Sequence, residues 1–192
     1  NVTFPQGATT FRAYANDSKG NTNSTSVIFF VDSIAPPISI ASPLNQSYNT
    51  TFILVNLTSD ATNSTIWFNW NGANTTYTSP INVTFPQGAT TFRAYANDSR
   101  GNTNNASVVF FVDSIAPPIA IISPQNRSYN TTLILVNLTS DATNSTIWFN
   151  WNGTNQTYTS PVSVYFPQGG TTLQAYANDS RGNTNNASVV FF

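Results

Sequence analysis

The sequence NVTFPQGATTFRAYANDS at residues 1–18 recurs unchanged at residues 82–99 and returns in altered form at residues 163–180. Both spacings are 81 residues. Residues 31–111 and 112–192 differ at only 13 positions. Repetition at a fixed period is the signature of an array of similar units, and such an array is usually built for length and not around one active site.

Within each copy, short runs of β-branched and aromatic residues are bounded by Gly, Pro, Asn and Ser, which is typical of β-strands joined by tight turns. In the middle copy the predicted strands are Ile38–Ala41, Thr51–Thr58, Thr65–Asn71, Ile81–Phe85, Thr90–Asn97 and Ser107–Val112, with Thr75–Thr78 as a candidate seventh strand. No helical periodicity accompanies these runs. The pattern predicts an all-β fold, with one antiparallel β-sandwich for each 81-residue repeat.

Alternation of side chains along each strand separates a core face from an outer face. Asn56 and Asn82 are expected on the outer face. The core residues predicted in the middle copy are Ile53, Val55, Leu57, Ile66, Phe68, Trp70, Ile81, Val83, Phe85, Phe92, Ala94, Ala96, Val108, Phe110 and Val112.

The composition leaves few groups for chemistry. The chain contains no Cys, His, Met or Glu, so its seven acidic side chains are all Asp. Without a thiol or an imidazole there is no zinc-type site, and the many Ser and Thr hydroxyls have no base to activate them. We therefore expect no catalytic residue, no metal and no cofactor, and hence not an enzyme.

Charge and hydropathy disfavour two classes of partner. The net charge is −1 and only 7% of the residues are charged, which gives no electrostatic footprint for nucleic acid or an anionic membrane. No apolar run approaches the ~20 residues that cross a bilayer, so we expect no membrane insertion in this window. Because the first residues include neither an initiator Met nor a signal peptide, we expect the window to come from a longer chain.

The succession of motifs in the middle copy supports a family comparison. SPLNQSYNTTFILVNLTSDA at 42–61, STIWFNWNG at 64–72, TFPQGATTFRAYANDSRGN at 84–102 and ASVVFFVDSIAPP at 106–118 resemble the tandem immunoglobulin-like (Big/Ig-like) repeats of archaeal, and some bacterial, cell-surface proteins. The resemblance covers the whole chain and implies an immunoglobulin-like sandwich. It implies less about function, because such modules serve in surface layers, stalks, filaments and adhesins.

The SIAPP segments at Ser33–Pro37 and Ser114–Pro118 mark the predicted domain boundaries. Residues 1–33 are then the last three strands of an incomplete Ig-like repeat with an uncovered core face. Residues 34–114 form a complete repeat, and residues 115–192 form a nearly complete one. Two prolines in each linker restrict the backbone, so successive domains are expected end to end with little hinge freedom.

Acceptor motifs for N-glycosylation, Asn-x-Ser/Thr, are enriched. The 27 Asn and the 49 Ser and Thr residues would give about 7 such motifs by chance. An Asn- and Thr-rich surface multiplied by copying is the simpler explanation, but the motif at Asn152 arises in the third copy while that at Asn82 is lost there. We therefore predict dense N-linked glycans on the 19 sites Asn1, Asn16, Asn23, Asn45, Asn49, Asn56, Asn63, Asn74, Asn82, Asn97, Asn105, Asn126, Asn130, Asn137, Asn144, Asn152, Asn155, Asn178 and Asn186.

Several large apolar residues fall on outward positions of the predicted strands. They are Trp67, Tyr95, Val109 and Phe111 in one sheet and Phe52 and Leu54 in the other. Exposed apolar groups usually mark a contact. They predict a lateral interface between chains, a platform on which attached sugars stack, or, less favoured, a groove for foreign glycans. A shifted register, or packing under neighbouring loops, would instead make them structural.

The aspartates near the domain ends have two interpretations. Asp32 and Asp113, together with Asp60 or Asp98 in loops, could supply oxygens to calcium at a junction. Calcium prefers six or more ligands, and each junction offers few carboxylates. Turn capping by Asp is therefore the favoured interpretation.

Together these features predict a non-enzymatic extracellular structural protein of an archaeal cell surface. The chain is expected to be a heavily N-glycosylated tandem Ig-like array that self-associates, end to end and laterally, into a surface filament, stalk or sheath. The alternative is the stalk of a surface adhesin, whose binding domain lies outside this window.

Overall fold

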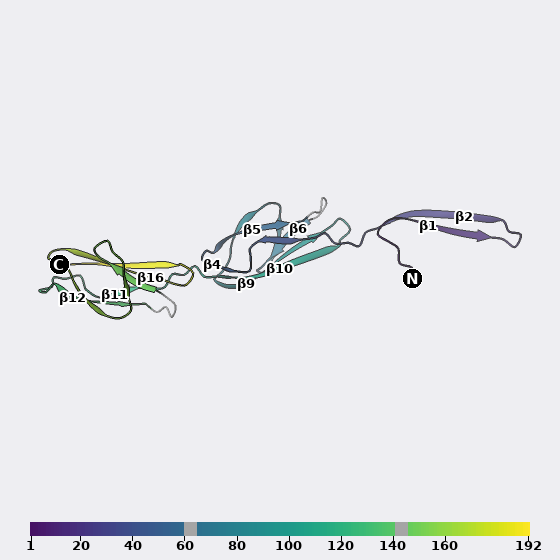
Figure 1. Cartoon of the computed structure of the whole chain (residues 1–192). Coiled ribbons are helices and arrows are strands. Elements are labelled where there is room, and N and C mark those ends of the chain that lie inside the picture. Colours follow the sequence, from purple (N-terminus) through teal and green to yellow (C-terminus); the bar gives the residue numbers. More distant parts are fainter. Residues whose placement is uncertain (60–64, 141–145) are drawn as a thin grey trace. The chain divides into compact units, whose positions relative to one another are not determined.

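The computed structural model describes residues 1–59, 65–140 and 146–192, and every regular element in that part of the chain is a β-strand (Figure 1). The strands are β1 (Gly7–Asn16), β2 (Thr22–Val31), β3 (Ser39–Ser42), β4 (Ser47–Tyr48), β5 (Phe52–Thr58), β6 (Thr65–Asn69), β7 (Thr75–Tyr77), β8 (Ile81–Thr84), β9 (Gly88–Asn97), β10 (Thr103–Val112), β11 (Ala120–Ser123), β12 (Leu133–Thr139), β13 (Thr146–Asn150), β14 (Gln156–Tyr158), β15 (Val162–Tyr165), β16 (Thr171–Asn178) and β17 (Thr184–Phe191).

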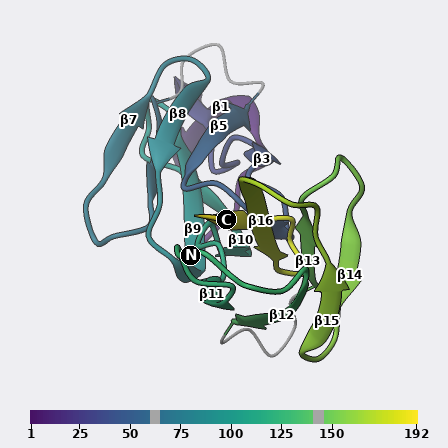
Figure 2. The same cartoon turned by 90° about the vertical axis from the view of Figure 1, so that its left-hand side faces the viewer.

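The C-terminal repeat consists of two antiparallel sheets, one with strand order β11-β12-β15 and the other with β14-β13-β16-β17 (green to yellow in Figure 2). The apolar core contains Phe149 and Leu173, which are fully buried, and Phe191, whose ring meets that of Phe166 edge to face at 5.0 Å. Tyr158 on β14 joins the two sheets, since its hydroxyl accepts the N–H of Leu138 on β12 at 3.0 Å. The apolar side chains that alternate along these strands thus face one another between the two sheets, and the repeat is a sandwich.

The middle repeat has the same strand order with one addition. Its sheets are β3-β5-β8 and β4-β10-β9-β6-β7, and the short strand β4 pairs in parallel with the end of β10. The sequence did not predict β4. The ring of Tyr48 packs edge to face on Phe110 at 5.6 Å, which fixes this segment beside β10.

By its internal contacts the chain divides into two compact units. One contains Asn1–Leu44, Leu54–Ile81 and Thr91–Val108, and the other contains Asn45–Ile53, Asn82–Thr90 and Val109–Phe192. The first SIAPP linker lies inside the first unit and the second linker inside the other.

The strand predictions for the middle repeat are confirmed within a few residues, including the seventh strand, β7. Strand β10 begins at Thr103 and not at Ser107. Most of the predicted core is buried, but Ile81 was assigned wrongly, because it is 49% exposed at the first position of β8. Tyr77 and Thr90 are buried and were not predicted.

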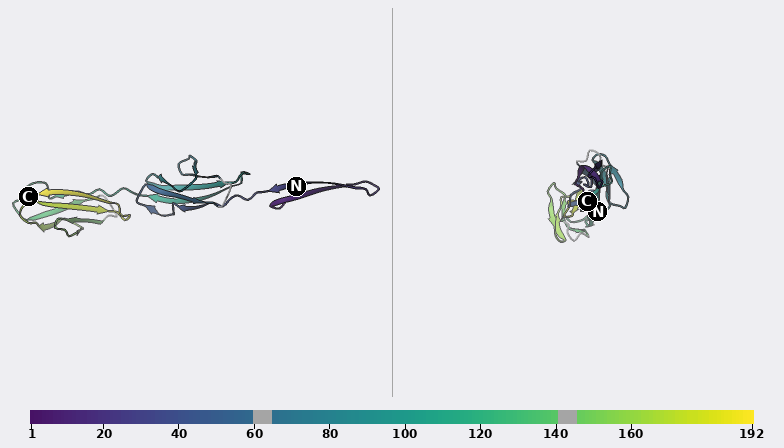
Figure 3. Two further views of the ribbon diagram at one scale, coloured as in Figure 1. Left: turned by 90° about the horizontal axis from the view of Figure 1, so that it is seen from above. Right: turned by 90° about the vertical axis from the view of Figure 1, so that its right-hand side faces the viewer.

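The N-terminal copy presents the same sequence in a different environment. Strands β1 and β2 form a two-stranded sheet (purple in Figure 3), in which Phe11 pairs with Val27. Residues 1–33 contain two strands and not the three that were expected, since residues 1–6 form no strand. Phe11 is 48% exposed, whereas its equivalent Phe92 is fully buried.

Candidate functional site

Each repeat carries a tight loop, Asp-Ser-Arg/Lys-Gly-Asn, that its own aspartate organises. In the C-terminal repeat, Asp179 Oδ1 accepts the backbone N–H groups of Arg181 and Asn183 at 2.8 and 2.9 Å. Gly182 takes a φ of 85°, in the left-handed region that favours glycine. The Asp17 and Asp98 loops have the same bonds, so the loop is preformed by local sequence.

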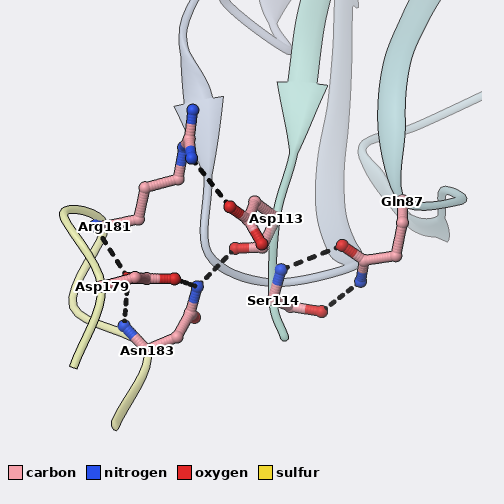
Figure 4. Close-up of polar contacts among 6 residues, drawn as sticks. All are labelled: Gln87, Asp113, Ser114, Asp179, Arg181 and Asn183. Carbon is pink, nitrogen blue, oxygen red and sulfur yellow. Dashed lines mark hydrogen bonds and ion pairs between the residues drawn. The ribbon is translucent and has the colours of Figure 1, made fainter. Parts of the chain in front are cut away.

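The asparagine that ends this loop also reaches the end of the preceding repeat. The Asn183 side-chain amide donates one hydrogen bond to Asp179 Oδ2 at 2.7 Å and another to the main-chain oxygen of Asp113 at 2.8 Å (Figure 4). Asn102 makes the equivalent bonds to Asp98 Oδ2 at 2.7 Å and to the main-chain oxygen of Asp32 at 3.1 Å. Both linkers are therefore bound in the same way.

An arginine of the same loop adds a second contact. Arg181 Nη1 donates to Asp113 Oδ2 at 2.7 Å (Figure 4). Its guanidinium lies 5.1 Å from the centre of the Phe111 ring. Arg100 repeats both contacts in the first linker, with Asp32 at 3.4 Å and with Phe30. These ion pairs are partly exposed, so each contributes at most about 1 kcal/mol. Phe111 is exposed, as its outward position predicted, and it also contacts the arginine of this junction.

The linker is also held by the repeat that it leaves. Gln87, in the turn before β9, accepts the Ser114 N–H on its side-chain oxygen at 3.1 Å and donates to the Ser114 hydroxyl at 2.5 Å. Gln6 makes the same two bonds with Ser33. We call this arrangement the linker clamp, defined as Asp113 and Ser114 with Gln87, Asp179, Arg181 and Asn183, and the equivalent Asp32 and Ser33 with Gln6, Asp98, Arg100 and Asn102.

Sequence reasoning missed the asparagines, the arginines and the glutamines of the linker clamp. Their partners lie 27, 68 or 70 residues away, and no local pattern indicates such pairing. The signal that was present is the recurrence of DSRGN and VDS together in successive copies.

The clamp predicts a dependence of stability on pH. The side-chain hydrogen bond from Asn102 is the main cause that lowers the pKa of Asp98 below its ordinary 3.8. Desolvation acts to raise the pKa of Asp179, but the hydrogen bonds from Asn183 and Arg181 outweigh it and the pKa is also lowered. Because the folded pKa lies below the unfolded one, these carboxylates stabilise the loops above about pH 4.

We therefore expect the melting temperature of the chain to be level from pH 7 to about pH 5 and to fall as the pH drops through 3.8 and below. Thermal unfolding measured at fixed ionic strength checks this expectation. The Asp98→Asn and Asp179→Asn double variant should be less stable at pH 7 and show a shallower fall. An unchanged slope in that variant would contradict the assignment.

The aspartates that were candidates for binding calcium make other interactions. Both Asp98 carboxylate oxygens accept hydrogen bonds within their own loop, and Asp32 and Asp113 face arginines. Asp60 lies outside the described residues. In the described ranges no group of three or more acidic or histidine side chains could hold a metal ion. The geometry of Asp98 is that of a turn cap, which was the favoured interpretation.

The asparagines of the acceptor motifs fall into two environments. Four are half-buried, namely Asn56, Asn97, Asn137 and Asn178. Asn56 lies on the outer face as predicted, and its Oδ1 accepts the hydroxyl of Tyr77 at 3.3 Å. Asn63 and Asn144 lie outside the described residues. The others are exposed, namely Asn1, Asn16, Asn23, Asn45, Asn49, Asn74, Asn82, Asn105, Asn126, Asn130, Asn152, Asn155 and Asn186.

The other predicted surface residues lie on the outer faces of the two sheets. Trp67 and Tyr95 pair across β6 and β9 with their rings stacked at 5.4 Å and an interplanar angle of 7°. Phe52 and Leu54 are exposed on β5, and Val109 is exposed on β10. The sequence therefore identified the Trp67–Tyr95 pair correctly as outward-facing.

Comparisons with known proteins concern the fold. No protein-family model matches the chain, and no curated protein matches it. The chain is similar to the fibronectin(III)-like modules of Clostridium thermocellum CbhA, with 18% identity over 81% of this chain and 93% of that one, at a TM-score of 0.44. Sidekick-1 immunoglobulin domains 1–4 give 13% identity over 92% of this chain and 55% of that one, also at 0.44. A Ca²⁺-stabilised adhesin of an Antarctic bacterium gives 18% identity over 96% and 55%, at 0.40.

The strand order and the repetition define the class of fold. The chain is an all-β protein of tandem immunoglobulin-like sandwiches. In the part of the chain that the structure describes, no helix has the length and apolarity needed to cross a membrane.

Proposed function

We propose that this chain belongs to a non-enzymatic extracellular structural protein of an archaeal cell surface. It forms a heavily N-glycosylated tandem Ig-like array in a surface filament, stalk or sheath. The observation that carries the proposal is the linker clamp, which recurs in both linkers with the same partners. A fixed joint repeated with every module suits a protein whose task is to extend.

The clamp is suited to transmit load and to limit swinging between modules. The last strand of one repeat leads directly into residues that the next repeat holds through a main-chain oxygen. A main-chain acceptor is present whatever the side chain is, so the bond depends on backbone position. Two prolines after each clamp reduce the freedom of the same segment further. Without such bonds, successive domains of one chain are expected to move relative to one another.

Glycans on the exposed asparagines account for the low charge of the chain. With 7% charged residues, ionised side chains provide little repulsion between molecules. Thirteen described acceptor asparagines are exposed and reachable by a transferase. A coat of sugars on them would keep the array soluble and shield it from proteases.

Electron cryomicroscopy of the native material, with its sugars retained, tests the proposal. We expect a fibre with an axial repeat of roughly 35–45 Å per module and non-protein density at the exposed asparagines. Glycosylated single rods that carry a distinct terminal domain would favour the adhesin stalk. A monomeric protein without sugars inside the cell would contradict both functions.

A further inference from the structure

One row of residues crosses the outer face of the C-terminal β14-β13-β16-β17 sheet. Trp148 on β13 pairs with Tyr176 on β16, and Tyr176 pairs with Asn186 on β17. The two rings are stacked, with centroids 5.3 Å apart and an interplanar angle of 8°. Neighbouring Ala175 and Ala177 are fully buried, which places Tyr176 on the opposite, outer face.

Asn186 is exposed and begins the acceptor motif Asn186-Ala-Ser188. Its main-chain N–H bonds to the Asn185 side chain at 2.9 Å, and no hydrogen bond among the described residues uses its own side-chain amide. Residues directly opposite in an antiparallel pair have Cβ atoms about 4.5–5.5 Å apart. A sugar attached to Asn186 Nδ2 therefore starts beside the Tyr176 ring and two strands away from Trp148.

The middle repeat contains the same constellation. Trp67 and Tyr95 are stacked at 5.4 Å, and the residue equivalent to Asn186 is Asn105, which is exposed and begins Asn105-Ala-Ser107. The N-terminal copy differs, because Tyr14 there pairs with Ser24. Its acceptor, Asn23, lies one position away, opposite Ala15. Stacked rings and acceptor asparagine thus occur together in the two repeats that have the full sheet.

The stacked aromatic rings and a sugar attached to the neighbouring asparagine have complementary surfaces. A pyranose ring has one face composed mainly of C–H groups, and an aromatic ring has an electron-rich face that attracts such slightly positive hydrogens. The half-buried rings lie on an outer face, where large apolar groups usually indicate a contact. A tethered sugar loses less freedom on stacking than a free one, since its position is already restricted.

We propose that Trp148–Tyr176 and Trp67–Tyr95 are stacking platforms for the first sugars of N-linked glycans on Asn186 and Asn105. This inference rests on the proposed glycosylation. In the attachment step, the asparagine Nδ2 forms a bond to the anomeric carbon of a phosphate-activated sugar donor. The phosphate leaves with the bonding electrons, and the amide loses one proton.

A thermodynamic cycle on the glycosylated chain tests the platform. Ser188→Ala removes the acceptor motif and leaves Asn186 in place, and Trp148→Ala removes half of the platform. We expect Ser188→Ala to lower the melting temperature by roughly 4–8 °C when Trp148 is present and to have little effect in the Trp148→Ala background. Trp148→Phe keeps an aromatic ring and should retain part of the coupling, so it serves if the alanine variant does not fold.

Two controls isolate the sugar. Ser128→Ala removes the exposed motif at Asn126, which lies in a loop, and should leave the melting temperature unchanged. Ser188→Ala in protein made without glycosylation should also have no effect. Glycopeptide mass spectrometry supplies the occupancy.

No sugar at any site overturns the glycosylation proposal and this one together. Sugars elsewhere with Asn186 bare, or an occupied Asn186 whose loss is additive with Trp148→Ala, overturn only the platform.

Discussion

Replacing Phe92 by alanine should lower the free energy of unfolding of the middle repeat by about 3–5 kcal/mol, whereas Phe11→Ala should cost under about 1 kcal/mol. Both residues sit in the same ten-residue sequence, Gly7–Asn16 and Gly88–Asn97. Phe92 is fully buried and stacks on Phe68 at 5.3 Å, so its loss opens a cavity. Phe11 is 48% exposed and leaves no enclosed void.

Hydrogen exchange of the 192-residue chain, followed by mass spectrometry, measures the two costs in separate segments. A melting temperature would not assign either cost to one repeat, since several modules unfold in one chain. Protection in β9 and β6 should collapse in Phe92→Ala and remain unchanged in Phe11→Ala. A similar loss of protection in β1 and β2 for Phe11→Ala would mean that the apolar face of this hairpin is covered in solution.

Replacing Asn183 by aspartate should destabilise the second linker clamp by about 1–3 kcal/mol. The change removes the donor to the Asp113 main-chain oxygen and places a second carboxylate beside Asp179. Asn21→Asp is the matched control. Asn21 makes the same bond within its own loop, to Asp17 at 2.8 Å, and within the described residues its side-chain amide donates to no main-chain oxygen outside that loop. The difference between the two variants isolates the linker contribution.

Pulsed electron paramagnetic resonance measures the effect of these two variants on the linker. Spin labels on the middle and C-terminal repeats report the distribution of distances between them. The distribution should widen in Asn183→Asp and stay the same in Asn21→Asp. Equal widths in Asn183→Asp and the unmodified chain would mean that the prolines alone determine the freedom of the linker.

The fold could be predicted from the sequence because alternation of apolar side chains decides which face of a strand is buried. That rule identified Val55, Phe68 and Phe92 correctly. It failed at Ile81, where the strand begins at an exposed position, and it missed Tyr77, whose hydroxyl bonds to the N–H of Leu57 at 3.1 Å in the other sheet. Alternation describes one strand at a time, whereas the burial of these two residues depends on the strands of the facing sheet.

The candidate site was only half predictable for the same reason. The outward-facing Trp67 and Tyr95 follow from strand register alone, and the structure brings their rings together. Phe111 is exposed as the register predicted, but its contact with the guanidinium of Arg181 could not be predicted. Contacts between residues of successive copies need the three-dimensional path of the chain, which no single copy of the sequence contains.

The spacing of the linker clamp has a consequence for how such a gene can grow. In both clamps the asparagine and the main-chain oxygen that it binds are 70 residues apart, which is less than the 81-residue period. Any in-frame duplication of one period therefore carries one donor and one acceptor, and the new joint is complete at the moment of recombination. Unequal crossing-over can lengthen or shorten the array by whole modules without a compensating mutation at either boundary.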